Sequence, residues 1–165
     1  MSKIDSIRTL QRCGVAVDME KYMREALALA REAAGHGEVP VGCVVFDEEG
    51  RIIGRGRNRR EEQPDACAHA EVEAIRGACL ARDSWNLSGC GLAVTLEPCP
   101  MCAGAIINSR ISTVVYGAKE PNSGSVGSVI NLFEENYGHR PKVYGGVLKD
   151  ECAGLLSDFF QKMRK

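Results

Sequence analysis

Two short motifs in the sequence carry side chains that bind transition metals. One is His69-Ala70-Glu71, and the other is Cys99-Pro100-Met101-Cys102. If both cysteines lie on one helix, their spacing of three residues places them about 60° apart around its axis, so both sulfurs face one point. The positive end of the helix dipole would also favour their thiolate forms. Two thiolates and one imidazole form a three-ligand zinc site with a fourth position open for water, which is typical of catalytic zinc.

Glu71 is the candidate proton carrier beside this site. Zinc lowers the pKa of a bound water towards neutrality, and a neighbouring carboxylate can then take the water's proton and pass it to a departing amine. On an ideal helix, residues two apart point about 200° apart, so His69 and Glu71 converge only if His69 lies in the first turn or just before it. His-x-Glu followed by Pro-Cys-x-x-Cys is the signature of zinc-dependent nucleobase deaminases, in which the glutamate is not a ligand.

A structural interpretation of the same motifs stays open. A single Cys-x-x-Cys also occurs as half of a structural zinc site or as a redox pair. The sequence has no second Cys-x-x-Cys, but it offers three other cysteines as a fourth ligand, Cys67, Cys79 and Cys90. A structural zinc would indicate a nucleic-acid-binding module rather than an enzyme, and such a site does not need Glu71.

The composition is that of one globular domain. The chain has 165 residues, a net charge of −1, 44% hydrophobic and 26% charged residues. This length is enough for a core without disulfides, and the eight cysteines are scattered singly except for the close pair Cys99 and Cys102. No run approaches about 18 uninterrupted apolar residues and the first residues do not form a signal peptide, so we expect a cytoplasmic protein with no membrane association. The balanced charge gives no general sign of a nucleic-acid partner.

The hydrophobic pattern predicts a helix, a hairpin and then alternating helices and strands. We expect helices at 18–35, 69–82, 98–108 and from about 150 onwards, a short helix at 129–135, and strands at 39–47, 51–58, 91–97, 113–118 and 142–148. This order favours an α/β domain with helices on both faces of one mixed sheet. Residues 1–17 have no clear period and are expected to be an extension, which leaves 18–165 as the single domain.

Residues 51–60 contain five arginines. Strand alternation places Arg55, Arg57 and Arg59 on one face and Asn58 on the other. The arginines would then contact RNA phosphates while Asn58 faces the pocket, or they would form a solvated edge strand that blocks aggregation. The basic residues near the C-terminus have the same two interpretations, because cations are favoured at helix C-termini; they are Lys162 and Arg164.

Several segments together resemble the bacterial tRNA-specific adenosine deaminases of the TadA type. They are 39–42, 68–71, 94–106, 114–118 and 155–160. The resemblance extends over about residues 19–165. The zinc motif is common to all cytidine-deaminase-like enzymes, whereas Thr95 to Gly104 and the ending Ser157-Asp158-Phe159-Phe160 are more specific to this group.

The resemblance implies a three-layer α/β/α cytidine-deaminase-like fold with a central mixed five-stranded sheet. It implies that a homodimer with one zinc per subunit hydrolyses the wobble adenosine of a tRNA anticodon to inosine, attacking C6 of an extruded base. In that role His69, Cys99 and Cys102 would hold zinc and Glu71 would carry protons. The residues expected to contact the substrate are Asn58, Val39, Ala70, Glu120 and Phe160.

Two stretches depart from the family pattern, and one rival activity remains. The loop after Ala118 begins Lys119-Glu120-Pro121-Asn122, and Gly138 stands where the family often has asparagine. Both stretches belong to tRNA-contact regions in the family. The rival is deamination of a free base or nucleoside such as guanine, cytosine or cytidine, which would use the same zinc site with a smaller, closed pocket.

Overall fold

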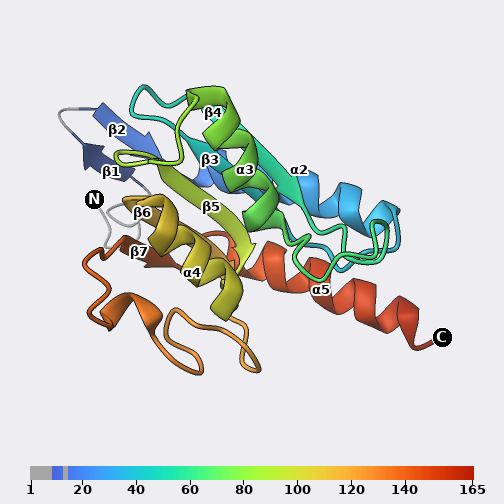
Figure 1. The fold of residues 1–165 in the computed structure, drawn as a ribbon. Helices are drawn as coiled ribbons and strands as arrows, with labels where there is room; N and C mark the ends of the chain where they lie inside the picture. The colour runs from blue at the N-terminus through green and yellow to red at the C-terminus, as the bar shows by residue number, and fades with distance from the viewer. Residues whose placement is uncertain (1–8, 13–14) are drawn as a thin grey trace.

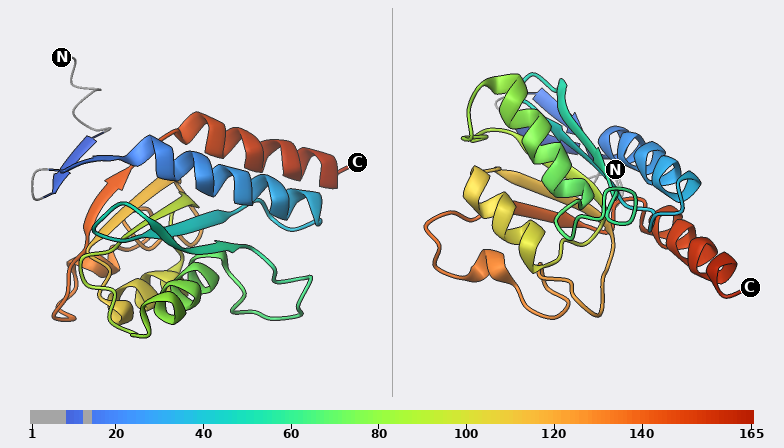
Figure 2. Two further views of the ribbon diagram at one scale, coloured as in Figure 1. Left: turned by 90° about the horizontal axis from the view of Figure 1, so that it is seen from above. Right: turned by 45° about the vertical axis from the view of Figure 1, so that its right-hand side comes forward.

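A mixed five-stranded sheet lies between two layers of helices in the computed structural model, which describes residues 9–12 and 15–165 (Figure 1). Helices α2 and α5 cover one face of the sheet and α3 and α4 cover the other, as the two views in Figure 2 show. The three-layer α/β/α prediction is confirmed. The helices are α2 (Met19–Gly35), α3 (Ala70–Arg82), α4 (Pro100–Ser109) and α5 (Lys149–Met163). The strands are β3 (Gly42–Phe46), β4 (Ile52–Arg57), β5 (Gly91–Leu96), β6 (Thr113–Ala118) and β7 (Lys142–Gly145).

The direction of the strands determines where a site can form. The order across the sheet is β4-β3-β5-β6-β7. Strand β3 is antiparallel to both β4 and β5, whereas β5, β6 and β7 are parallel. The carboxyl ends of β5 and β6 therefore share one edge, which is where ligands bind in open α/β sheets.

The sheet separates two apolar cores. One lies under α3 and α4 and includes Ile75, Leu92 and Ile106; the other lies under α2 and α5 and includes Met23, Leu27 and Val44. A fully buried side chain of this size contributes about 1.5–3 kcal/mol. Both helical layers are thus held to the sheet by burial.

The starts of α2 and α3 agree with the expected ones, whereas the start of α4 differs. Helix α2 begins at Met19, and Asp18 caps it by accepting a hydrogen bond from Lys21 N–H at 3.2 Å. Helix α3 begins at Ala70, with His69 extended just before it, which is the helix-edge position that the spacing required. Helix α4 begins at Pro100, not at Pro98 as expected. The reason is that the Pro98 carbonyl accepts a hydrogen bond from Ser125 N–H at 2.8 Å, which ties this residue to a loop instead.

The N-terminal segment and the short helix also differ from the expectations. Strands β1 (Thr9–Arg12) and β2 (Val15–Asp18) form a separate antiparallel pair, which the pattern of residues 1–17 did not predict. The rest of that expected extension, 1–8 and 13–14, lies outside the described residues. The helix expected at 129–135 is a 3-10 turn, η1 (Leu132–Glu134). Among the described residues, no helix is both long and apolar enough to cross a membrane.

Two glycines of β4 allow α3 to lie directly against the strand. A Cβ atom on Gly56 would lie 2.1 Å from the Ala70 carbonyl oxygen, and one on Gly54 would lie 2.1 Å from the Ala74 carbonyl oxygen. Both contacts are with backbone, which cannot rotate away. The absent side chains thus set the distance between β4 and the helix that begins beside His69.

We expect Gly56→Ala to lower the free energy of unfolding by about 2–3 kcal/mol, because the helix must move off the strand. Urea denaturation measures this change. Gly154→Ala is the matched control: no atom lies within 4 Å of the added Cβ, and alanine in a helix is favoured over glycine by about 1 kcal/mol. Equal stability of Gly56→Ala and the wild type would contradict the packing argument.

Candidate active site

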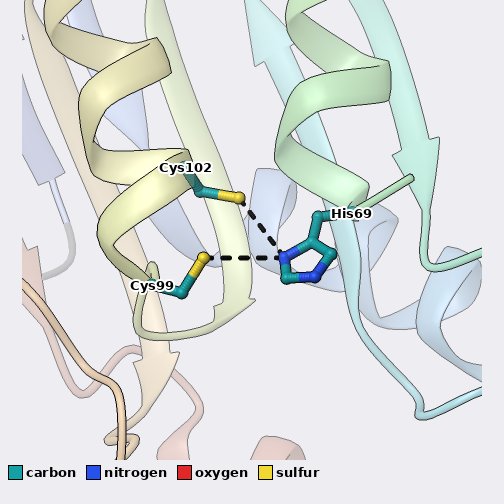
Figure 3. A group of neighbouring side chains, drawn as sticks. All are labelled: His69, Cys99 and Cys102. Carbon is teal, nitrogen blue, oxygen red and sulfur yellow. Dashed lines mark hydrogen bonds between the residues drawn. The ribbon is translucent and has the colours of Figure 1, made fainter. Parts of the chain in front are cut away.

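The expected metal ligands converge at the carboxyl edge of the sheet. The Nδ1 atom of His69 lies 3.6 Å from the Cys99 sulfur and 3.5 Å from the Cys102 sulfur (Figure 3). The three ligand atoms all lie within 4.8 Å of one another. The histidine comes from the start of α3 and both cysteines from the start of α4. Residues thirty positions apart in sequence thus meet at one point.

Each ligand is placed by a helix terminus. His69 and Cys99 are the N-cap residues of α3 and α4, and both have extended backbone conformations. Cys102 lies in the first turn of α4 and is fully buried. Cys99 therefore stands just before the helix rather than inside it, but the spacing of three residues still points both sulfurs at the same imidazole.

The distances fit a zinc ion. Tetrahedral zinc with a Zn–S bond of about 2.3 Å and a Zn–N bond of about 2.0 Å holds its nitrogen and sulfur ligands about 3.5 Å apart. Both observed sulfur-to-nitrogen distances agree with this value. Two thiolates and an imidazole are also ligand types that zinc prefers. The three residues could therefore hold zinc with one position left for water.

The polar groups of the cluster shift one another's proton affinities. The hydrogen bond from the Cys102 thiol, together with the one to His69, lowers the pKa of Cys99 to about 4. The same bond and burial raise the pKa of Cys102. The contact with Cys99 raises the pKa of His69. The Cys99 thiolate is thus the group that carries negative charge in this arrangement.

Glu71 lies beside the ligands and is only 4% exposed. Burial, followed by the nearby Cys99 charge, raises the pKa of its carboxyl to about 7. It belongs to the first turn of α3, two residues after His69, and it lines the same cavity. Its carboxylate is therefore placed to exchange protons with a molecule in that cavity.

The cavity over the cluster has a volume of about 270 Å³. That volume is at the small end for ligand pockets and suits one flat heterocyclic base. Eight of the predicted site residues line it: Val39, Asn58, His69, Ala70, Glu71, Cys99, Glu120 and Phe160. Apolar wall is added by Val41 and Leu96. Cys102 is fully buried and is not among the lining residues.

Asn58 is fixed at the cavity by its backbone and its side chain. Its amide N–H bonds the Val41 carbonyl at 3.1 Å, and its side-chain Nδ2 donates to the Val39 carbonyl at 3.4 Å. The side-chain oxygen accepts a hydrogen bond from Arg60 N–H. The carboxamide is thus held at the rim where strand β4 ends.

The arginines of β4 only partly follow the expectation. Alternation is as predicted, since Arg55 and Arg57 lie on the face opposite Gly54 and Gly56. Arg57, however, is buried, and its guanidinium pairs with Glu62 at 2.8 Å and Glu32 at 3.3 Å. The expectation that it meets a phosphate is therefore wrong, because α2 covers this part of the face and supplies Glu32.

The other candidate phosphate contacts lie outside the cavity wall. Arg55 is exposed, and the half-buried Arg59 pairs with Glu62 at 3.4 Å. Lys162 and Arg164 are exposed at the end of α5. None of these four residues lines the cavity. Contact of these four with RNA stays a prediction.

Sequence reasoning missed two buried carboxylates that hold the loops around the cavity. Glu97, only 2% exposed, accepts hydrogen bonds from the backbone N–H groups of Glu120, Val126 and Ser128 and from the Ser128 hydroxyl. Glu38, only 1% exposed, accepts from the N–H groups of Glu61 and Glu62. In the sequence, Glu38 stands directly before the expected strand at 39–47, and Glu97 stands directly before Pro98. Acidic residues are too common at such positions to identify either one as a buried acceptor for loop N–H groups.

Two helix starts that lie side by side on one face of a mixed sheet and present a histidine, two cysteines and a buried glutamate define a zinc-dependent deaminase. Comparison with known proteins agrees. The family model for the cytidine and deoxycytidylate deaminase zinc-binding region matches residues 17–118. The tRNA-specific adenosine deaminase of Bacillus subtilis strain 168 is 48% identical over 147 residues, which cover 88% of this chain and 91% of that protein.

Solved structures give the same assignment. A structure from work on A-to-I editing by tRNA:A34 deaminases superimposes with a TM-score of 0.79 at 44% identity, covering 82% of this chain and 99% of that chain. The guanine deaminase of Nitrosomonas europaea is more distant, with a TM-score of 0.71 at 26% identity over 96% of this chain and 93% of that chain. The chain belongs to the cytidine and deoxycytidylate deaminase family, and within it to the group of the tRNA-specific adenosine deaminases.

Replacing Glu97 by glutamine should release the loop that carries Glu120. The amide keeps one acceptor oxygen, so two of the four hydrogen bonds are lost together with the charge. Since hydrogen bonds to charged groups contribute about 1.5–3 kcal/mol each, we expect the loss of two to lower the free energy of unfolding by about 3–6 kcal/mol. Urea denaturation and amide hydrogen exchange of residues 120–128 measure the two effects.

Glu135→Gln is the control, because Glu135 is an exposed carboxylate in the same connection between β6 and β7. It should leave both measurements unchanged. Undisturbed exchange protection in Glu97→Gln would show that the loop does not depend on this carboxylate.

Proposed function

We propose that this protein hydrolyses the wobble adenosine of a tRNA anticodon to inosine. The observation that carries the proposal is the cluster of His69, Cys99 and Cys102 with Glu71 at the floor of a cavity sized for one base. The relatives named as tRNA-specific adenosine deaminases supply the substrate class. An anticodon loop is single-stranded, so its bases can turn outwards at a low unstacking cost.

Three residues would bind zinc, and the chain's own groups would handle the protons. Zinc held by His69, Cys99 and Cys102 would act as a Lewis acid and make water nucleophilic near neutral pH. The reaction forms a C6–O bond and breaks the C6–N6 bond, so water's two protons must reach N1 and the departing N6. Glu71 takes each proton in turn and delivers the first to N1 and the second to N6, which leaves as ammonia.

The cavity walls would hold the base in the orientation that this chemistry needs. Val39, Ala70 and Phe160 offer apolar contact to the faces and edges of a ring, and Asn58 offers a carboxamide that both donates and accepts. Because Glu71 lines the cavity beside His69 and Cys99, C6 must point towards these residues for N6 to reach Glu71. Orientation of this kind converts binding into rate acceleration.

We also propose that the protein is a cytoplasmic homodimer with one zinc per subunit. The seven cysteines among the described residues are free thiols, which fits a reducing compartment. The resemblance to the tRNA deaminases implies the dimer, and the exposed apolar side chains of Trp85, Val129 and Ile130 offer surface for it.

The zinc-loaded protein should form inosine in an RNA anticodon stem-loop with adenosine at the wobble position. The assay is nucleoside analysis of the RNA after incubation, beside parallel reactions with free adenosine, guanine, cytosine and cytidine. Because the guanine deaminase of Nitrosomonas europaea shares the fold, turnover of a free base alone would move the substrate to that class and leave the zinc site unaffected.

Glu71→Gln should keep zinc and lose activity, because the carboxylate carries protons and is not a ligand. We expect inosine formation to fall by about 10²–10⁴-fold, with zinc content measured by atomic absorption unchanged. His69→Ala is the contrasting variant and should lose zinc. Loss of zinc in Glu71→Gln would make Glu71 a ligand, and retained activity would require another proton carrier.

A further inference from the structure

Arg60 is more exposed and less strongly paired than its neighbours Arg57 and Arg59. Arg57 and Arg59 share Glu62, and both are at least half buried. The side chain of Arg60 is 58% exposed, and its guanidinium forms a loose ion pair of 3.7 Å with the exposed Glu61. Surface pairs of this kind are worth little. Its guanidinium is therefore available to a ligand.

Arg60 also lines the cavity over the proposed zinc site. Strand alternation singled out Arg55, Arg57 and Arg59, but the strand ends at Arg57 and the chain enters a turn at Arg60. Arg60 lies after the end of the strand, so the alternation of a strand could not predict its position at the rim.

The backbone of Arg60 is fixed even though its side chain is free. Its N–H donates to the Asn58 side-chain oxygen at 3.3 Å, and its carbonyl accepts from Asp65 N–H at 3.1 Å. The next two N–H groups, of Glu61 and Glu62, bond the buried Glu38 carboxylate at 2.8 and 2.6 Å. A long cationic side chain therefore projects from an anchored point that also holds Asn58.

The charges around the cavity are unequal. Glu120 lines it from the loop after β6, and Glu71 and Glu97 are buried in its wall, so Arg60 is the one guanidinium or ammonium among the described lining residues. With a net charge of −1, the protein has no general attraction for polyanions. A phosphate attached to a bound nucleotide would be repelled on the Glu120 side and attracted on the Arg60 side.

We propose that Arg60 binds a backbone phosphate next to the target nucleotide and so makes the protein select RNA over free bases and nucleosides. The inference rests on the proposed function and adds to it the residue that recognises the backbone. Guanidinium suits this task because its N–H groups match two phosphate oxygens at once.

Arg60→Ala tests this with a zinc-loaded protein and an anticodon stem-loop. We expect KM to rise about 5- to 20-fold at low salt, with kcat within about twofold. The slope of log KM against log salt should fall by about 0.7, since one phosphate contact to a single strand is lost. Arg60→Lys keeps the charge and should retain most of the salt slope with a smaller rise in KM.

A binding measurement separates this role from a structural one. The Kd of the inosine-containing product stem-loop, measured by fluorescence anisotropy, should rise with KM in Arg60→Ala. The inhibition constant of adenosine against the stem-loop reaction should stay the same, whereas that of adenosine 5′-monophosphate tests whether any phosphate suffices. Arg24→Ala is the matched control, because Arg24 is equally exposed at 58% but lies on α2, away from the cavity.

The outcomes distinguish the two proposals. If the wild type neither binds nor deaminates the stem-loop, the proposed function and this inference both fail. If the wild type deaminates it and Arg60→Ala has the same KM and salt slope, the inference alone fails. A fall in kcat with unchanged KM would also overturn it, because Arg60 would then act on the chemistry or on the shape of the site.

Discussion

Two helices begin at the active site without a capping side chain, and the rest of the structure depends on that arrangement. N-cap positions favour Ser, Thr, Asp and Asn, whose side chains bond the free N–H groups of the first turn. At the starts of α3 and α4 these positions hold His69 and Cys99, and neither makes a cap bond. Each helix thus gives up about 1 kcal/mol of capping so that its N-cap side chain can serve as a ligand. The positive ends of both helices point at the same place, which favours thiolates there.

Helix ends of this kind stay in place only if the elements beneath them do. Gly54 and Gly56 let α3 lie directly on β4, and the buried apolar residues under α3 and α4 hold both helices to the sheet. Around the mouth of the cavity, the Glu38 and Glu97 carboxylates accept hydrogen bonds from loop N–H groups, as backbone carbonyls do in helices and strands. Their carboxylates collect backbone N–H groups from two loops that have no strand partner. A buried carboxylate is costly unless hydrogen-bonded, so each loop is stable in one conformation that satisfies its anchor.

Much of the fold and the centre of the site could be predicted, because both depend on local spacing. The period of α2 and the hairpin of β3 and β4 follow from residues close in sequence. The cluster of His69, Cys99 and Cys102 with Glu71 was predicted from two motifs that are each local, although the motifs lie thirty positions apart. What could not be predicted depends on distant partners. Strand alternation gave the face of Arg57 but not Glu32, which lies 25 positions earlier on α2. The start of α4 moved from Pro98 to Pro100 because Ser125, on a loop far along the chain, takes the Pro98 carbonyl. Arg60 was missed for a related reason, since a loop residue has no period to place it.

The same division explains how one zinc site can serve different substrates within this fold. The floor of the cavity is built from helix ends and strand edges, where any displacement disturbs several packed neighbours at once. Its rim is built from Asn58 and Arg60 on one loop, Glu120 on another and Phe160 on α5, whose outer half lies beyond the sheet (Figure 1). Loops tolerate substitution far better than packed elements do. The guanine deaminase of Nitrosomonas europaea has the same fold at 26% identity, so a difference in substrate is compatible with one architecture. Under the proposed function, selection of a tRNA over a free base would depend on the charge and shape of the rim, because the hydrolysis of an amine at the floor is the same reaction for both.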